Sequence, residues 1–115
     1  MSKGSDTLLG IVKEIFLNQI IVLEHNIAEY GSLFLDIYLP QLLIAFEFDG
    51  EQHFTYSKYF HKYRQAFLES KKRDQAKESR CAQLGIKLIR VKFDEVITKD
   101  LVLAKIKAVL DRSDK

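Results

Sequence analysis

Residues 33–50 read LFLDIYLPQLLIAFEFDG, an almost wholly apolar run that is interrupted by Pro40 and Gln41. Its β-branched and aromatic content predicts two strands, residues 33–39 and 42–48, which are joined by a tight turn at Pro40-Gln41. Near-continuous apolar strands of this kind are typical of a sheet that is covered on both faces. The run therefore favours a sheet in the middle of a layered domain.

The segments on either side of this run complete an α/β pattern. Residues 7–19 have apolar positions at helical spacing, and residues 20–25 form a short strand candidate. Further along, residues 60–84 predict a long helix that ends at Gly85, residues 86–93 a strand, and residues 98–111 a capped amphipathic helix. We predict an α/β fold with an αβββαβ core, a mixed central sheet flanked by helices, and a C-terminal helix.

Length and composition indicate one globular domain, residues 1–115, with 47% hydrophobic and 30% charged residues. We expect residues 1–6 to be disordered. Cys81 is the only cysteine of the sequence, which excludes an internal disulfide framework and a cysteine-based zinc cage. No apolar run is as long as a membrane span, and no signal peptide opens the sequence, so we expect a soluble intracellular protein without a membrane partner.

Basic residues concentrate in one part of the sequence, although the formal net charge is only +2. Residues 58–77 contain seven basic residues against two acids. The functional interpretation is a surface that binds a polyanion, and the commoner one is a solvated helix face. The candidates for contacts with phosphate groups are Lys58, His61, Lys62, Arg64, Lys71, Lys72 and Arg73.

Two carboxylates interrupt the apolar strands. In a hairpin with a two-residue turn, Asp36 lies opposite Ala45, and Glu47 is its diagonal neighbour on the same face, roughly 7–8 Å away. Two carboxylates at this spacing can share a cation, and hard oxygen ligands favour Mg²⁺ or Mn²⁺ over zinc. The alternative is that Asp36 pairs with a nearby lysine. We favour metal binding, because two unshared carboxylates would repel each other in a partly dry site.

The long helix carries a further inward-facing acid. Phe60, Phe67, Asp74 and Cys81 recur every seven residues, so they lie along one side of the helix. A carboxylate that faces inward needs a partner, and His53 follows the adjacent strand. Asp74 would then fix the tautomer of His53 and leave its second nitrogen to take a proton from water. The alternative is an Asp–His pair with a purely structural role.

Taken in order, these residues resemble the PD-(D/E)xK nuclease superfamily with its restriction-endonuclease-like fold. The closest resemblance is to its EDxHD branch, which includes very short patch repair endonucleases and phage homing endonucleases. The E would be Glu14, the D Asp36, the x Glu47 or Phe48, the H His53 and the final D Asp74. The lysine of (D/E)xK is absent, since Asp49 stands in its place, which favours the His/Asp dyad as its replacement.

The resemblance implies a metal-dependent DNA endonuclease that nicks one strand per active site. Asp36, Glu47 and Asp49 would be metal ligands, and Glu14 would orient a metal-bound water. It also implies DNA as partner, with a homodimer or larger complex supplying specificity, in the cytoplasm of a bacterial or phage-infected cell. The alternative is a catalytically silent nucleic-acid-binding domain or subunit on the same fold.

Overall fold

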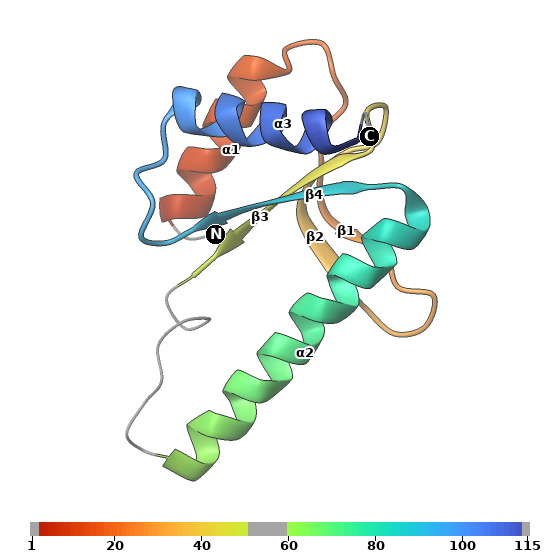
Figure 1. Cartoon of the computed structure of the whole chain (residues 1–115), viewed down its shortest axis with the longest axis vertical. Coiled ribbons are helices and arrows are strands. Elements are labelled where there is room, and N and C mark those ends of the chain that lie inside the picture. The colour runs from red at the N-terminus through yellow and green to blue at the C-terminus, as the bar shows by residue number, and fades with distance from the viewer. Residues whose placement is uncertain (1–2, 51–59, 114–115) are drawn as a thin grey trace.

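The computed structural model of the 115-residue chain describes residues 3–50 and 60–113. The backbone forms three helices and four strands in these two ranges (Figure 1). In chain order they are α1 (Lys3–Ile15), β1 (Val22–Asn26), β2 (Phe34–Leu39), β3 (Ile44–Asp49), α2 (Phe60–Leu84), β4 (Lys87–Lys92) and α3 (Lys99–Ser113). The predicted α/β class and the predicted element order are confirmed.

The four strands form one mixed sheet in the order β1-β2-β3-β4. The β1–β2 and β2–β3 pairs are antiparallel, and β3 and β4 are parallel. A parallel pair needs a long crossover, and α2 is the helix within that crossover. The chain therefore passes from β3 to β4 across one face of the sheet.

The helices divide between the two faces of the sheet (Figure 1). On one face, α1 and α3 bury the larger apolar cluster, in which Leu8 and Val102 from the helices meet Ile37, Phe46 and Val91 from the strands. Alternation along β3 sends Ala45 and Glu47 to the other face, where α2 lies. This is the sandwich of helix, sheet and helix that the apolar strands predict.

The face under α2 holds a smaller apolar cluster. It contains Tyr38 and Ala45 from the sheet, Cys81 from α2 and Ile86 from the turn that follows. Only the C-terminal part of α2 packs there, whereas its N-terminal half projects beyond the sheet (Figure 1). Room is therefore left beside this cluster for polar groups of β3, β4 and α2.

The boundaries of α1 differ from the prediction. The helix spans Lys3–Ile15, not residues 7–19, so residues 3–6 are ordered in its first turns. A Cβ atom on Gly4 would clash with the ring of Phe48, which shows how closely the helix approaches β3. Glycine at position 4 permits this close contact, which the polar sequence at the N-terminal end of α1 does not predict.

The predicted hairpin register is wrong by two residues: each residue of β2 lies opposite the residue of β3 two positions further along the chain than predicted. Residues 40–43 form a four-residue turn in which Leu43 has a φ of 55°. Consequently Tyr38, not Asp36, is the partner of Ala45, and Ile37 pairs with Phe46. One step further in the same register places Asp36 directly opposite Glu47, on the same face as predicted.

The remaining boundaries agree closely with the sequence patterns. Helix α2 has its predicted bounds, and Gly85, with a φ of 74°, ends it. The amide of Ile86 donates to the carbonyl of Cys81 at 2.8 Å, as in a Schellman cap. Thr98 caps α3 by accepting a hydrogen bond from the amide of Leu101 at 3.1 Å.

Candidate active site

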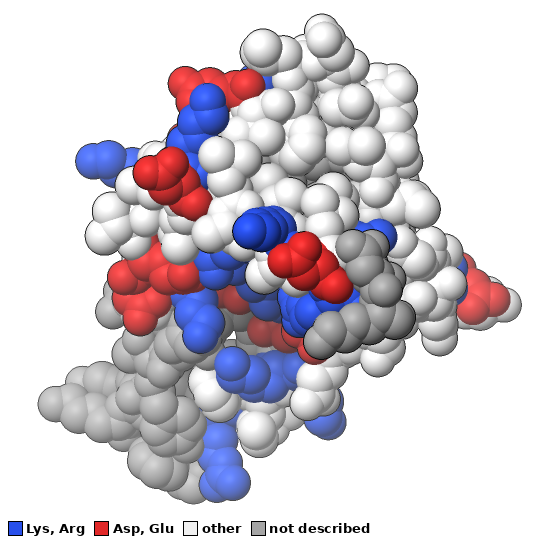
Figure 2. All heavy atoms as spheres, turned by 45° about the horizontal axis from the view of Figure 1, so that its top comes forward, with Lys and Arg blue, Asp and Glu red and all other residues white. Residues whose placement is uncertain are grey.

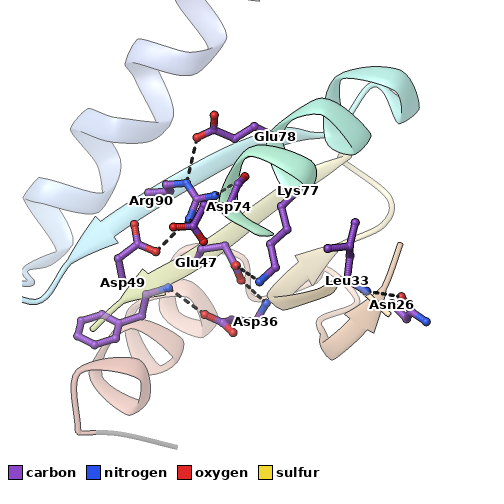
Figure 3. A network of polar contacts seen from close by, with 10 residues as sticks. Asn26, Leu33, Asp36, Glu47, Asp49, Asp74, Lys77, Glu78 and Arg90 are labelled. Atoms are coloured by element: carbon purple, nitrogen blue, oxygen red, sulfur yellow. Dashed lines mark hydrogen bonds and ion pairs between the residues drawn. The ribbon is translucent and has the colours of Figure 1, made fainter. Parts of the chain in front are cut away.

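Asp36 and Glu47 are held against each other by backbone hydrogen bonds (Figure 3). The amide of Asp36 donates to Oε2 of Glu47 at 2.6 Å, and the amide of Phe48 donates to Oδ2 of Asp36 at 2.9 Å. Each carboxylate is thus fixed by the other strand of the hairpin. The two acids that the sequence singles out as a metal pair are adjacent.

Lys77 of α2 completes this pair. Its Nζ atom lies 2.5 Å from Oε1 of Glu47, in an ion pair whose side chains are 13% and 4% exposed. Burial raises the pKa of Glu47 to about 7, the charge of Asp36 adds to the rise, and Lys77 opposes it. Glu47 is therefore a buried carboxylate that is close to titrating at neutral pH.

Arg90 of β4 joins three acids of the same face. Its guanidinium donates to Oδ1 of Asp49 at 3.0 Å and to Oε1 of Glu78 at 3.2 Å, and it lies 3.9 Å from Oδ1 of Asp74. Burial opposes the charge of Arg90, but Asp49 and Asp74 outweigh it, so the pKa of Arg90 is raised. The guanidinium also bonds the carbonyl of Asp74 at 3.2 Å, which ties α2 to the sheet.

A charged cleft of about 240 Å³ opens beside Arg90. Its lining comes from the end of β3, the outer part of β4 and the middle of α2: Asp49, Lys71, Asp74, Gln75, Glu78, Arg90 and Lys92. Figure 2 shows cations and carboxylates intermixed over the middle of the visible face, with some acids recessed. The cleft offers both signs of charge, and its cations suit phosphate oxygens.

The predicted dyad falls partly outside this description. His53 lies outside the described residues, so its pairing with Asp74 stays a prediction. Asp74 does face the sheet, as its heptad position predicts, with its side chain 19% exposed. The described cation beside it is Arg90, which the sequence reasoning did not consider.

Two further predicted site residues differ in placement from the acid pair. Asp49 is 5% exposed, on the same face as Glu47, where it binds Arg90. Glu14 is exposed on α1, in the helix layer that covers the opposite face of the sheet. Asp49 therefore belongs to the polar network, whereas α1 does not deliver Glu14 to the face of Asp36.

The predicted phosphate contacts, as far as they are described, lie on α2. Arg64, Lys72 and Arg73 are exposed, and the ammonium of Lys71 sits 5.4 Å from the ring centre of Phe67. Lys58 and the side chains of His61 and Lys62 lie outside the described residues. Lys71 is thus the predicted contact that also lines the cleft.

Sequence reasoning missed the site roles of Lys77 and Arg90, two cations that pair with the buried acids of β3. Lys77 follows Asp74 by three residues and so shares its helix face. In the parallel register Arg90 is the partner of Glu47. Both signals depend on knowing how β4 and α2 pair with β3, which the sequence pattern alone does not give.

The carboxylates of Asp36 and Glu47 are hard oxygen ligands, the kind that a divalent ion such as Mg²⁺ prefers. Within residues 3–50 and 60–113, no group of three or more His, Cys, Asp or Glu side chains is arranged to hold a metal. Magnesium commonly binds through one or two carboxylates and completes its shell with water and phosphate oxygens. Asp36 and Glu47 would supply that minimal set.

Among the described helices, none is long and apolar enough to cross a membrane.

No protein-family model matches the chain. Uncharacterized protein 094L of Frog virus 3 (isolate Goorha) is 43% identical over 63 residues, which are 54% of this chain and 41% of that protein. Uncharacterized protein 307L of Invertebrate iridescent virus 6 is 34% identical over 62 residues, or 54% and 32%. Uncharacterized protein 033L of Invertebrate iridescent virus 3 is 29% identical over 63 residues, or 55% and 32%. The matching stretch thus spans less than half of each relative.

Proposed function

We propose that the protein is a metal-dependent endonuclease that hydrolyses phosphodiester bonds of DNA. The observation that carries the proposal is the Asp36–Glu47 pair, in which each carboxylate accepts a backbone hydrogen bond from the other strand of a mainly apolar hairpin. Glu47 is buried and Asp36 is half-buried, and placing two carboxylates side by side there costs free energy unless a cation or a proton compensates them. A site that binds a divalent ion explains why both acids stand there.

In this proposal, Asp36 and Glu47 would hold Mg²⁺ or Mn²⁺. The bound ion would polarise the phosphate and stabilise the charge that develops on it. His53 lies outside the described residues; in this proposal Asp74 would orient its imidazole, which would take a proton from the attacking water. Asp49 contributes through Arg90, as a charge that neutralises this cation beside the site.

The cations of α2 are the reason for proposing a nucleic acid as the substrate. Arg64, Lys72 and Arg73 are exposed on α2, and Lys71 lines the cleft. Contacts of this kind bind the phosphate backbone without selecting a sequence. A second copy of the chain or further protein would then supply target choice and the second nick of a double-strand break.

The order of elements, with a crossover helix between the parallel strands, agrees with a PD-(D/E)xK assignment, EDxHD branch, which we propose on the same grounds. The competing proposal is a silent nucleic-acid-binding domain. One observation favours it, since Lys77 and Arg90 already compensate Glu47 and Asp49 within the protein. The two proposals agree on DNA binding and differ on cleavage.

A plasmid-nicking assay with Mg²⁺ or Mn²⁺ separates the two proposals. We expect nicking that a chelator stops, that Asp36→Asn abolishes and that His53→Ala slows by about 10²–10⁴-fold. Asp111→Asn, an exposed acid at the end of α3, is the matched control and should leave nicking unchanged. Cleavage that survives chelator and Asp36→Asn would overturn the metal mechanism, and salt-dependent DNA binding without cleavage would favour the silent domain.

A further inference from the structure

The two acids of the proposed site are engaged unequally. Both oxygens of Glu47 have a partner, since Oε2 accepts the amide of Asp36 and Oε1 accepts the ammonium of Lys77. Among the described contacts of Asp36, Oδ2 accepts the amide of Phe48 and no contact uses Oδ1. A divalent ion that needs both carboxylates therefore meets a lone pair on Asp36 and a cation on Glu47.

The Lys77 ammonium and a divalent ion would compete for Oε1 of Glu47. The ammonium nitrogen lies 2.5 Å from Oε1, and a divalent ion bound to that oxygen would occupy the same space, since Mg²⁺ binds oxygen at 2.0–2.1 Å. Two cations on one oxygen would lie a few ångströms apart in a part of the protein where water screens them weakly. Occupation by one cation thus disfavours the other.

We propose that Lys77 is a resident cation of the site, which compensates Glu47 until a divalent ion binds and displaces it. The inference rests on the proposed metal site and adds how that site is regulated. Lysine suits this role because its ammonium is a point charge on a flexible stem with rotatable donors. The side chain is 13% exposed, so it must turn outward when it leaves Glu47.

The displacement predicts a change in the chemical reactivity of one amine. A lysine in a buried ion pair reacts slowly with an acylating reagent, and an exposed lysine reacts fast. The full chain would be pulse-labelled with an amine-reactive acetyl ester at pH 8, in chelator or in saturating Mg²⁺ or Mn²⁺ at matched ionic strength. Mass spectrometry of its peptides then gives the labelled fraction of each lysine. Calorimetry on the same samples establishes whether the ion binds.

We expect labelling of Lys77 to rise at least fivefold when the ion binds. Lys107, exposed on α3, serves as the internal control and should label equally in both conditions. Glu47→Gln should make Lys77 reactive without any metal, and if that variant does not fold, the wild-type comparison suffices. Bound metal with Lys77 still protected would overturn the displacement alone. Calorimetry that detects no metal binding would overturn the proposed metal site, and the displacement with it.

Discussion

The two faces of the sheet bury different kinds of side chain, although the same strands supply both faces. Under α1 and α3, Phe46 and Val91 pack into an apolar cluster. Under α2, Glu47 and Asp49 are buried at 3% and 5% exposure beside a smaller cluster. Because alternate residues of a strand point to opposite faces, the six residues of β3 carry both patterns.

The contrast indicates what each face contributes. Burial of apolar surface stabilises the fold without directional requirements. Buried ion pairs contribute little net stability, because the loss of hydration cancels much of the attraction. Charges such as Glu47 and Lys77 are therefore poorly explained by stability alone, and the face under α2 is the better place to look for function.

The largest effect should come from the apolar face. Phe46 is fully buried there, so Phe46→Ala removes a ring and leaves a cavity, at a cost of about 3–5 kcal/mol in the free energy of unfolding. Leu103→Ala, on an α3 residue that is 42% exposed, is the control and should cost well under half as much. Chemical denaturation measures both. Equal losses would mean that the face under α1 and α3 is not the main core.

The buried acid Glu47, on the face under α2, should make the free energy of unfolding depend on pH. The pKa of Glu47 is raised to about 7 from an ordinary value of 4.5, so the folded protein holds a proton that the unfolded chain releases between these values. Stability should therefore fall as the pH rises from about 5 to 8, by on the order of 2–3 kcal/mol at about 1.36 kcal/mol per pKa unit.

Denaturation at a series of pH values tests this slope, with Glu47→Gln as the comparison. The glutamine variant has no carboxyl proton to lose at this position, so its stability should vary less over the same range. A wild-type protein that gains stability between pH 5 and 8, or a variant with an unchanged slope, would contradict the assignment to Glu47.

The sequence predicted the elements well because local signals specify them. Gly85 ends α2 and Thr98 begins α3 through contacts within a few residues. The register of the hairpin was missed because the turn has four residues instead of two, with Leu43 in a conformation that leucine seldom adopts. Alternation still placed Asp36 and Glu47 on one face, since the error was an even number of residues.

The candidate site was predicted less completely, for a physical reason. Asp36 and Glu47 come from one hairpin, so local alternation brings them together. Lys77 meets Glu47, and Arg90 meets Asp49, only because α2 and β4 fold back on β3, and the sequence context of both cations is that of ordinary charged residues. The partner of Asp74 depends on the same long-range packing, which placed Arg90 beside it.

The smallest effect concerns the seam between α1 and β3, where two glycines of one helix provide a matched pair. Gly4→Ala would push a methyl group into the ring of Phe48, whereas a Cβ on Gly10 meets nothing within 4 Å. We expect Gly4→Ala to cost about 1–2 kcal/mol and Gly10→Ala to gain about 0.5–1 kcal/mol, the usual benefit of alanine in a helix. Thermal or chemical denaturation measures both.

The same two variants test whether the face under α1 and α3 is coupled to the face under α2. The amide of Phe48 holds Oδ2 of Asp36, so a displaced Phe48 ring should disturb the acid pair through its own backbone. If the proposed site binds Mg²⁺, Gly4→Ala should weaken that binding as well as stability, while Gly10→Ala should leave the binding unchanged. If both variants were equally stable, the first turn of α1 would not be seated on β3. If Gly4→Ala lost stability but kept its metal affinity, the two faces would be independent despite sharing a strand.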